Sequence, residues 1–300
     1  MRIAAAFLVL AALAARAEPP RHAVTKLHTG FRFVEGPAVD KDGNLYFTDI
    51  PNERIMKRTK DGTLSVLREK SGRANGLFVH GKGKELYACE GGNGVVSALA
   101  LDGKSRRVVA EKYDGKRFNA PNDLVIDKAG GVYFTDPKFG RNRADLPQGM
   151  LAVYYADATG KVARVAAQLP LPNGVILSPD EKTLYIVTSG SDRVWAYPVE
   201  KPGQLGTRKL FFRIKQPRGK TDTGGDGLTV DKNGMLYITT RRGLQVVDKT
   251  GQLVDIIEIP ETPANVTFGG TAWKTLYVTA RTSLYAVEVE TAGHRFPAGK

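Results

Sequence analysis

The chain has 300 residues, 42% of them hydrophobic and 25% charged, and its formal net charge is +13. This is an ordinary globular composition with enough apolar side chains for a sizeable core. The basic residues are scattered rather than gathered in a block interleaved with aromatic side chains, which argues against nucleic-acid binding and leaves a general bias toward anions.

The first residues have the pattern of a secretory signal peptide. Arg2 precedes an apolar run over residues 3–15, and residues 15–17 form a small-x-small cleavage sequence. The run is too short to span a bilayer, and we expect no membrane association of the mature chain. The pattern therefore predicts a leader over residues 1–17, a single domain over residues 18–300, and an exported protein, periplasmic or secreted.

Cysteine usage excludes stabilisation by an internal disulfide. Cys89 is the only cysteine in the chain. Its neighbours are apolar, so we expect Cys89 to be buried in the core rather than to act as a nucleophile. The fold must then depend on its core, with a bound metal as a second source of stability.

A short hydrophobic strand with a tyrosine at its second position recurs six times along the chain. These tyrosines are Tyr46, Tyr87, Tyr133, Tyr185, Tyr237 and Tyr277. Glycine-containing turns precede the strands, as at residues 42–44, 129–131 and 233–234. Another short apolar strand precedes each turn, and two more follow each tyrosine strand.

Four short strands in each period of about 45 residues are typical of a propeller blade. The sequence therefore predicts an all-β fold, a six-bladed β-propeller with four antiparallel strands per blade. We expect a strand near residues 23–27 to complete the last blade, so that N- and C-terminal strands close the ring.

A side-chain oxygen lies eleven or twelve residues before each repeated tyrosine. The six residues are Glu35, Asn75, Asn122, Asn173, Asp226 and Asn265. Equivalent positions at the starts of the innermost strands should face one place on the propeller axis. Six oxygen donors there, two of them carboxylates, suit a hard divalent cation such as Ca²⁺. The alternative is that Asn, Asp and Gly are turn formers, but glutamate is not.

Other hydrolytic centres find no support in the sequence. None of the four histidines lies in these loops, which argues against a His-ligated zinc site. No Gly-x-Ser-x-Gly motif occurs, so a Ser-His-Asp hydrolase is also disfavoured.

Four segments resemble motifs of the gluconolactonase/regucalcin family, in the same order along the chain. They are residues 33–37, 117–137, 171–180 and 226–234. The resemblance implies a six-bladed propeller lactonase with one catalytic divalent metal ion, Ca²⁺ in the first place and Zn²⁺, Mg²⁺ or Mn²⁺ as alternatives.

Site residues are carried over from the motifs position by position. The resemblance implies that Glu35, Asn173 and Asp226 are metal ligands. It places Asn122 at the metal, where it helps to hold substrate or water, and makes Asp226 the general base. These four residues coincide with four of the six positions found from the spacing.

Substrate recognition departs from the family pattern. Regucalcin-like members have a sugar-binding arginine two residues before the motif asparagine, where this chain has Ala120, and the nearest arginine is Arg117. We expect residues 138–149 to form a lid. The candidate substrate-binding residues are Arg117, Asn75, Asn265 and Arg141.

The predicted reaction is metal-dependent hydrolysis of a sugar-type lactone, a small-molecule substrate, with no obligate protein partner. One alternative is a related esterase acting on aryl lactones or organophosphates. Another is a non-catalytic propeller of the YWTD or NHL type that binds proteins, because a fold alone does not fix a function.

Overall fold

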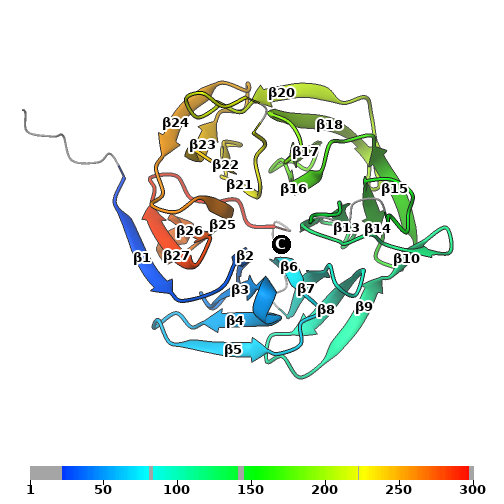
Figure 1. The fold of residues 1–300 in the computed structure, drawn as a ribbon, viewed down its shortest axis with the longest axis horizontal. Helices are drawn as coiled ribbons and strands as arrows, with labels where there is room; N and C mark the ends of the chain where they lie inside the picture. Colours follow the sequence, from blue (N-terminus) through cyan, green and yellow to red (C-terminus); the bar gives the residue numbers. More distant parts are fainter. Residues whose placement is uncertain (1–21, 81–83, 141–144, 222, 297–300) are drawn as a thin grey trace, which may run out of the picture.

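Six antiparallel sheets surround a central axis like the blades of a propeller (Figure 1), which confirms the predicted fold. The computed structural model describes residues 22–80, 84–140, 145–221 and 223–296. The predicted leader, residues 1–17, lies outside the described residues. No helix in the described ranges is long and apolar enough to cross a membrane.

In each of the first five blades the strands follow one another in sequence order, starting from the innermost strand. The first blade is β2 (Val34–Val39), β3 (Leu45–Asp49), β4 (Arg54–Arg58) and β5 (Leu64–Arg68). The second is β6 (Ala74–Val79), β7 (Glu85–Glu90), β8 (Val95–Ala100) and β9 (Arg106–Ala110). The third is β12 (Leu124–Ile126), β13 (Val132–Asp136), β14 (Ala152–Ala156) and β15 (Val162–Ala167).

The fourth blade is β16 (Pro172–Leu177), β17 (Thr183–Thr188), β18 (Arg193–Lys201) and β20 (Lys209–Arg213), with β19 (Gln204–Leu205) also paired to β18. The fifth is β21 (Leu228–Val230), β22 (Leu236–Thr240), β23 (Gly243–Val247) and β24 (Leu253–Ile257). Outside the blades lie the ribbon of β10 (Lys112–Tyr113) and β11 (Lys116–Arg117) and the 3₁₀ turns η1 (Ile50–Asn52) and η2 (Thr271–Trp273).

The two ends of the chain meet in the sixth blade. Three of its strands are β25 (Pro263–Gly269), β26 (Thr275–Ala280) and β27 (Ser283–Glu288). The outermost strand is β1 (Val24–Thr29), which pairs antiparallel with β27. The predicted closure by an N-terminal strand is therefore confirmed, and β27 is left with no open edge.

Aspartates at the ends of the inner strands fix three of the turns that follow. The carboxylate of Asp40 accepts hydrogen bonds from the backbone N–H groups of Asp42 and Asn44. Asp127 and Asp231 do the same in their own turns. Such side chain–backbone bonds favour a tight turn. They therefore set the register in which each tyrosine strand pairs with its inner strand.

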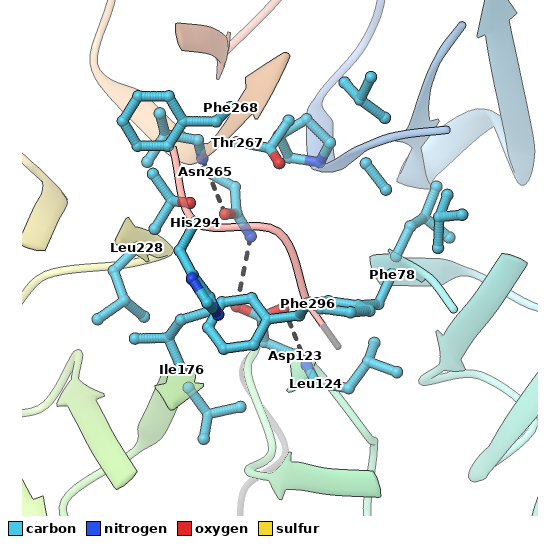
Figure 2. Close-up of a pocket in the computed structure, with 18 of the residues that line it drawn as sticks. Phe78, Asp123, Leu124, Ile176, Leu228, Asn265, Thr267, Phe268, His294 and Phe296 are labelled. Atoms are coloured by element: carbon cyan, nitrogen blue, oxygen red, sulfur yellow. Dashed lines mark hydrogen bonds between the residues drawn. The ribbon is translucent and has the colours of Figure 1, made fainter. Parts of the chain in front are cut away.

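The C-terminal segment returns to the axis on the side where the inner strands end. The N–H of Gly293 donates to the carbonyl of Trp273, and the N–H of His294 donates to that of Val230. Figure 2 shows His294 and Phe296 in the middle of the ring, with Phe78 facing Phe296. Their ring centroids are 6.1 Å apart, so this segment covers one end of the axial channel.

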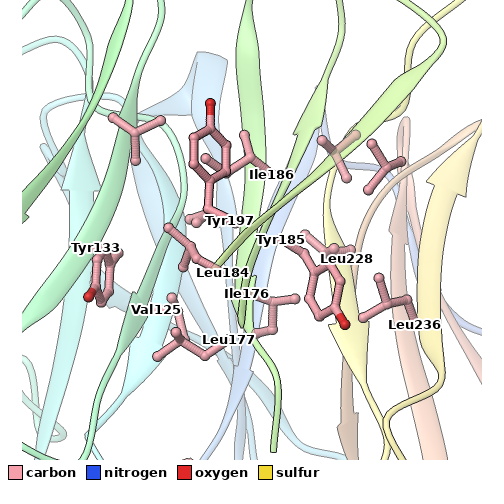
Figure 3. Packing of buried hydrophobic residues seen from close by; sticks show 14 of the residues in the cluster. Val125, Tyr133, Ile176, Leu177, Leu184, Tyr185, Ile186, Tyr197, Leu228 and Leu236 are labelled. Carbon is pink, nitrogen blue, oxygen red and sulfur yellow. The ribbon is translucent and has the colours of Figure 1, made fainter. Parts of the chain in front are cut away.

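The hydrophobic core lies between blades rather than at the axis. Figure 3 shows one cluster, which covers both faces of the fourth blade: Tyr133 of the third blade lies on one side, and Tyr185 of the fourth lies with Leu236 of the fifth on the other. Cys89 is fully buried in a neighbouring cluster, as predicted. Because apolar side chains hold the blade faces together, the axis itself is free to carry polar groups.

Candidate active site at the propeller axis

Five of the six predicted oxygen residues line one cavity at the end of the axis where the inner strands start. They are Glu35, Asn75, Asn122, Asn173 and Asp226. The cavity has a volume of about 390 Å³. The structure thus brings together all the residues expected at the metal.

Irregular pairing turns these residues toward the axis. The register of β2 against β3 shifts between Glu35 and Ala38, and that of β16 against β17 shifts between Pro172 and Val175. Similar shifts occur at the starts of β6 and β25. An inserted residue bends a strand and re-aims its side chains, so the shift gives the first residues of an inner strand an orientation that regular alternation would not.

Neighbouring blades approach each other at the glycines that follow four of the ring residues. The N–H of Gly76 donates to the carbonyl of Asn122, and that of Gly174 donates to the carbonyl of Asp226. A Cβ atom on Gly76 would lie 2.7 Å from the Asn122 carbonyl oxygen, and one on Gly174 would lie 2.5 Å from that of Asp226. These glycines are required because only a residue without a side chain permits such close backbone approach.

Asp123 occupies the corresponding place in the third blade, where the other blades have glycine or, in the sixth, Val266. Its buried carboxylate accepts a hydrogen bond from the N–H of Leu124 at 2.9 Å. The other oxygen lies 3.5 Å from the amide nitrogen of Asn265 (Figure 2). Asp123 is not among the residues predicted for the site. The signal was a carboxylate at a position that carries glycine in four of the six repeats.

Asn265 is placed differently from the other ring residues. It lines a second, smaller cavity of about 80 Å³ on the far side of the ring, together with Asp123, His294 and Phe296 (Figure 2). Among the described residues, the Nε2 atom of His294 is buried without a hydrogen-bond partner. The assignment of Asn265 to substrate binding stays a prediction, and its position favours a role behind the ring.

Burial gives the carboxyls at the axis unusually high pKa values. It raises the pKa of Asp226 to about 7, an effect that the hydrogen bond from Asn173 opposes. Burial also raises the pKa of Asp123 to about 7. It raises the pKa of Glu35 well above its ordinary value, with a further contribution from the negative charge of Asp226. Raised pKa values in several neighbouring carboxyls are typical of catalytic groups or of ligands that bind a cation.

The donor set fits a hard divalent cation. Glu35 and Asp226 supply carboxylate oxygens, and Asn122 and Asn173 carry amide oxygens in the same cavity. Within the described ranges, no group of three or more His, Cys, Asp or Glu side chains is placed to hold a metal ion. A cation here would therefore take two carboxylates and complete its shell with amide oxygens and water, as Ca²⁺ does readily.

A second cavity adjoins the one that holds the ring residues. The two cavities are the first and second lobes of one open mouth at this end of the axis. Phe33, Phe139 and Asp226 line both lobes, and each lobe has a volume of about 390 Å³. Arg73 lines the first lobe, and Arg241 and Arg281 line the second. The site is therefore an open depression with the carboxylates at its base and three arginines at its rim.

The arginines chosen from the sequence are not those at this rim. Arg117 lies at the end of β11, exposed, and its guanidinium donates to the carbonyl of Gly92 at 3.3 Å. Arg141 lies outside the described residues, as does part of the predicted lid. The signal for Arg241 and Arg281 was available, since each lies four residues after a repeated tyrosine.

Comparison with known proteins agrees with this architecture. Residues 33–282 match the family model described as SMP-30/Gluconolactonase/LRE-like region. A gluconolactonase of Zymomonas mobilis is 30% identical over 285 residues, which cover 87% of this chain and 80% of the relative. A gluconolactonase of Xanthomonas campestris whose structure is solved is 30% identical, with a TM-score of 0.81 over 90% of each chain.

A calcium-binding protein, regucalcin of Agrobacterium tumefaciens, shares the fold at a lower level of identity. It is 20% identical, with a TM-score of 0.76 over 91% of this chain and 95% of that one.

Proposed function

The chain belongs to the SMP-30/gluconolactonase/LRE-like family, and from this membership we propose that it hydrolyses a sugar-type lactone with the help of one divalent metal ion, Ca²⁺ in the first place. The observation that carries the proposal is the convergence of Glu35, Asn122, Asn173 and Asp226 on one open cavity at the axis.

Glu35, Asn173 and Asp226, with Asn122 beside them, would hold the metal ion. When bound, the ion supplies a Lewis acid that polarises the lactone carbonyl and stabilises the negative charge developing on its oxygen. The two carboxylates balance the charge of a divalent cation, and the asparagines add no further charge.

Asp226 has the properties expected of a general base. It is only partly buried, so a water molecule can reach it from the cavity. Burial raises the pKa of Asp226 to about 7 in the metal-free chain, and a bound cation would lower it, so the carboxylate is ionised and able to accept a proton at neutral pH. The water oxygen bonds to the carbonyl carbon as its proton passes to Asp226. The ring C–O bond then breaks, and the leaving oxygen takes the proton from Asp226, which gives the open hydroxy acid and regenerates the carboxylate.

Asn173 and Asn122 position these groups. The amide of Asn173 donates to the carboxylate of Asp226 and to the hydroxyl of Ser189, which fixes the carboxylate beside the cavity. The backbone of Asn122 is held between the second and third blades by Gly76 and Thr135. Its side chain is therefore set to orient water or substrate with little loss of entropy on binding.

The test is hydrolysis of D-glucono-1,5-lactone, followed by proton release, with the full chain stripped of metal by a chelator. Ca²⁺, Mg²⁺, Mn²⁺ and Zn²⁺ are added back in turn, and Glu35→Gln and Asp226→Ala are measured beside the wild type. We expect metal-restored turnover that both variants lose. If metal binds and no lactone is opened, the reaction is wrong. If no metal binds, the metal site is wrong and a protein-binding propeller becomes the better interpretation.

We also propose, on the sequence pattern alone, that residues 1–17 direct export. The mass of the protein recovered from the periplasm or medium should correspond to a chain beginning at Glu18. Recovery of the full-length chain from the cytoplasmic fraction alone would contradict export.

A further inference from the structure

One position in each repeat supplies the rim of the site. It lies four residues after the repeated tyrosine, where the second strand of the blade leaves the sheet. The residues there are Ile50, Gly91, Pro137, Ser189, Arg241 and Arg281. All but Pro137 line one or other lobe of the mouth. Only the fifth and sixth blades place a charged side chain at this position, so the rim is cationic on one side.

Arg241 and Arg281 follow β22 and β26, in the short turns that lead to β23 and β27. Both residues are exposed and both line the second lobe. Within the described part of the chain, neither guanidinium has a hydrogen bond or an ion pair to a protein group. Other arginines in the molecule are paired, as Arg106 is with Glu90 and Arg213 with Asp192.

An acidic residue beside this rim, Glu261, is already engaged elsewhere. Glu261 precedes Thr262, which lines the second lobe. Its carboxylate accepts hydrogen bonds from the N–H and hydroxyl of Thr282 and from the hydroxyls of Ser283 and Tyr285. Among the described residues, Asp226 is the only acidic residue that lines the second lobe, and it lies at the boundary with the first lobe. Two cationic side chains therefore face a lobe in which the described wall residues provide no counter-charge beyond Asp226.

The backbone at Arg281 supports a role for its side chain. Its φ is 48°, in the left-handed region that favours glycine. Arg73, which lines the first lobe, has the same conformation with φ of 54°. Non-glycine residues in this region cost conformational energy and gather at functional sites.

Resting on the proposed function, we propose that the substrate is a lactone with an anionic substituent, a carboxylate, sulfonate or phosphate. The anion lies in the second lobe between Arg241 and Arg281, while the ester group lies beside Asp226 in the first. The planar guanidinium group binds such anions through two parallel hydrogen bonds. The shared wall at Asp226 connects the two lobes, so one molecule can reach both.

The test uses a matched pair of lactones that differ only at carbon 6, D-glucono-1,5-lactone and its 6-phosphate. Arg241→Ala and Arg281→Ala are compared with Arg242→Ala. Arg242 is the matched control because it is exposed in the same turn as Arg241 and lines neither lobe. We expect the wild type to prefer the phosphorylated lactone in kcat/KM. The preference should fall roughly fivefold in each rim variant, as for a partly exposed charge pair, and persist in Arg242→Ala.

Equal kcat/KM for the two lactones in the wild type would overturn the inference and leave the lactonase proposal intact. An equal loss of preference in Arg242→Ala would also overturn it, because net charge would then explain the effect. If neither lactone is opened, the lactonase proposal fails. Calorimetry with 6-phosphogluconate and gluconate then decides on anion recognition: tighter binding of the phosphate, lost in Arg241→Ala, supports it, and equal binding overturns it.

Discussion

The side-chain amide of Asn173 donates a hydrogen bond to the carboxylate of Asp226 across the boundary between the fourth and fifth blades, with 2.5 Å between Nδ2 and Oδ1. The same amide nitrogen lies 2.8 Å from the hydroxyl oxygen of Ser189. Asn173 thus fixes the position of the proposed base, Asp226. The same hydrogen bond holds the pKa of Asp226 below the value that burial alone would give.

Removing this bond should raise the pKa of Asp226, so that less of the ionised base is present at neutral pH, and should free the carboxylate from its fixed position. In Asn173→Ala we expect kcat/KM to fall by about tenfold or more, and the rising limb of its pH profile to move to higher pH. Ser189→Ala is the control, because it leaves the bond to Asp226 in place. The measurement is kcat/KM for D-glucono-1,5-lactone across the neutral range, and an unshifted limb in Asn173→Ala would count against this role.

Metal-free protein should lose stability as pH rises. Burial raises the pKa of Asp123 and of Asp226 to about 7, above the value of about 3.9 in an unfolded chain. Between these values the folded protein binds the protons more tightly than the unfolded chain does. The contribution of these two carboxyls to the free energy of unfolding is therefore greatest below about pH 4 and decreases as pH rises through about 7.

Thermal melts in chelator over this range test the trend. Asp123→Asn should reduce the decrease, because one of the titrating groups is gone. Added Ca²⁺ should raise the melting temperature most at the high end of the range, since it binds the ionised carboxylates. A melting temperature independent of pH in chelator would contradict the burial of these ionisable groups.

A methyl group at Gly76 should disrupt the ring. A Cβ there would lie 2.5 Å from a carboxylate oxygen of Asp123 and 2.8 Å from its Cα. Because backbone atoms cannot move aside, we expect Gly76→Ala to cost about 3 kcal/mol of stability and to weaken metal binding. Gly206→Ala is the matched control, since its closest contact is the flexible end of Glu200 at 3.1 Å. Denaturant unfolding of both variants, with and without Ca²⁺, gives the comparison.

His294 should destabilise the protein in acid. Burial lowers the pKa of His294 below its ordinary value of 6.5. The unfolded chain therefore binds a proton before the folded protein does, and the histidine's contribution to stability decreases as pH falls below 6.5. This trend is opposite in sign to that of the axial carboxyls, so the two are separable by mutation.

His294→Leu should stabilise the protein by about 1 kcal/mol near neutral pH, because it removes a buried nitrogen that has no partner among the described residues. The gain should grow in acid. Denaturant midpoints of the wild type and His294→Leu at a series of pH values provide the measurement. A loss of stability that is constant across pH would mean that His294 has a packing role at the closed end of the channel.

Much of this protein could be predicted from the sequence because its repeats are local. Strands joined by short turns pair in order, so the spacing of six tyrosines predicts the blades and the residues that start each inner strand. The same spacing predicts Glu35, Asn122, Asn173 and Asp226 as neighbours at the axis, although Asn173 and Asp226 are far apart in the chain. The closing strand β1 could be predicted because an unpaired edge in the last blade would be costly.

Only the tertiary structure decided which way the axial side chains face and what surrounds them. Asn265 has the spacing of a ring residue, yet it lies with Asp123 on the far side. The register shift of β25 lies before Asn265, which itself pairs with Thr279, whereas the shifts of β6 and β16 span Asn75 and Asn173. Arg241 and Arg281 line one lobe together with Asp226, which their shared place four residues after a repeated tyrosine does not reveal. Periodicity fixes distances along a strand, whereas a side chain's direction depends on strand irregularities and on contacts between blades, which no single repeat contains.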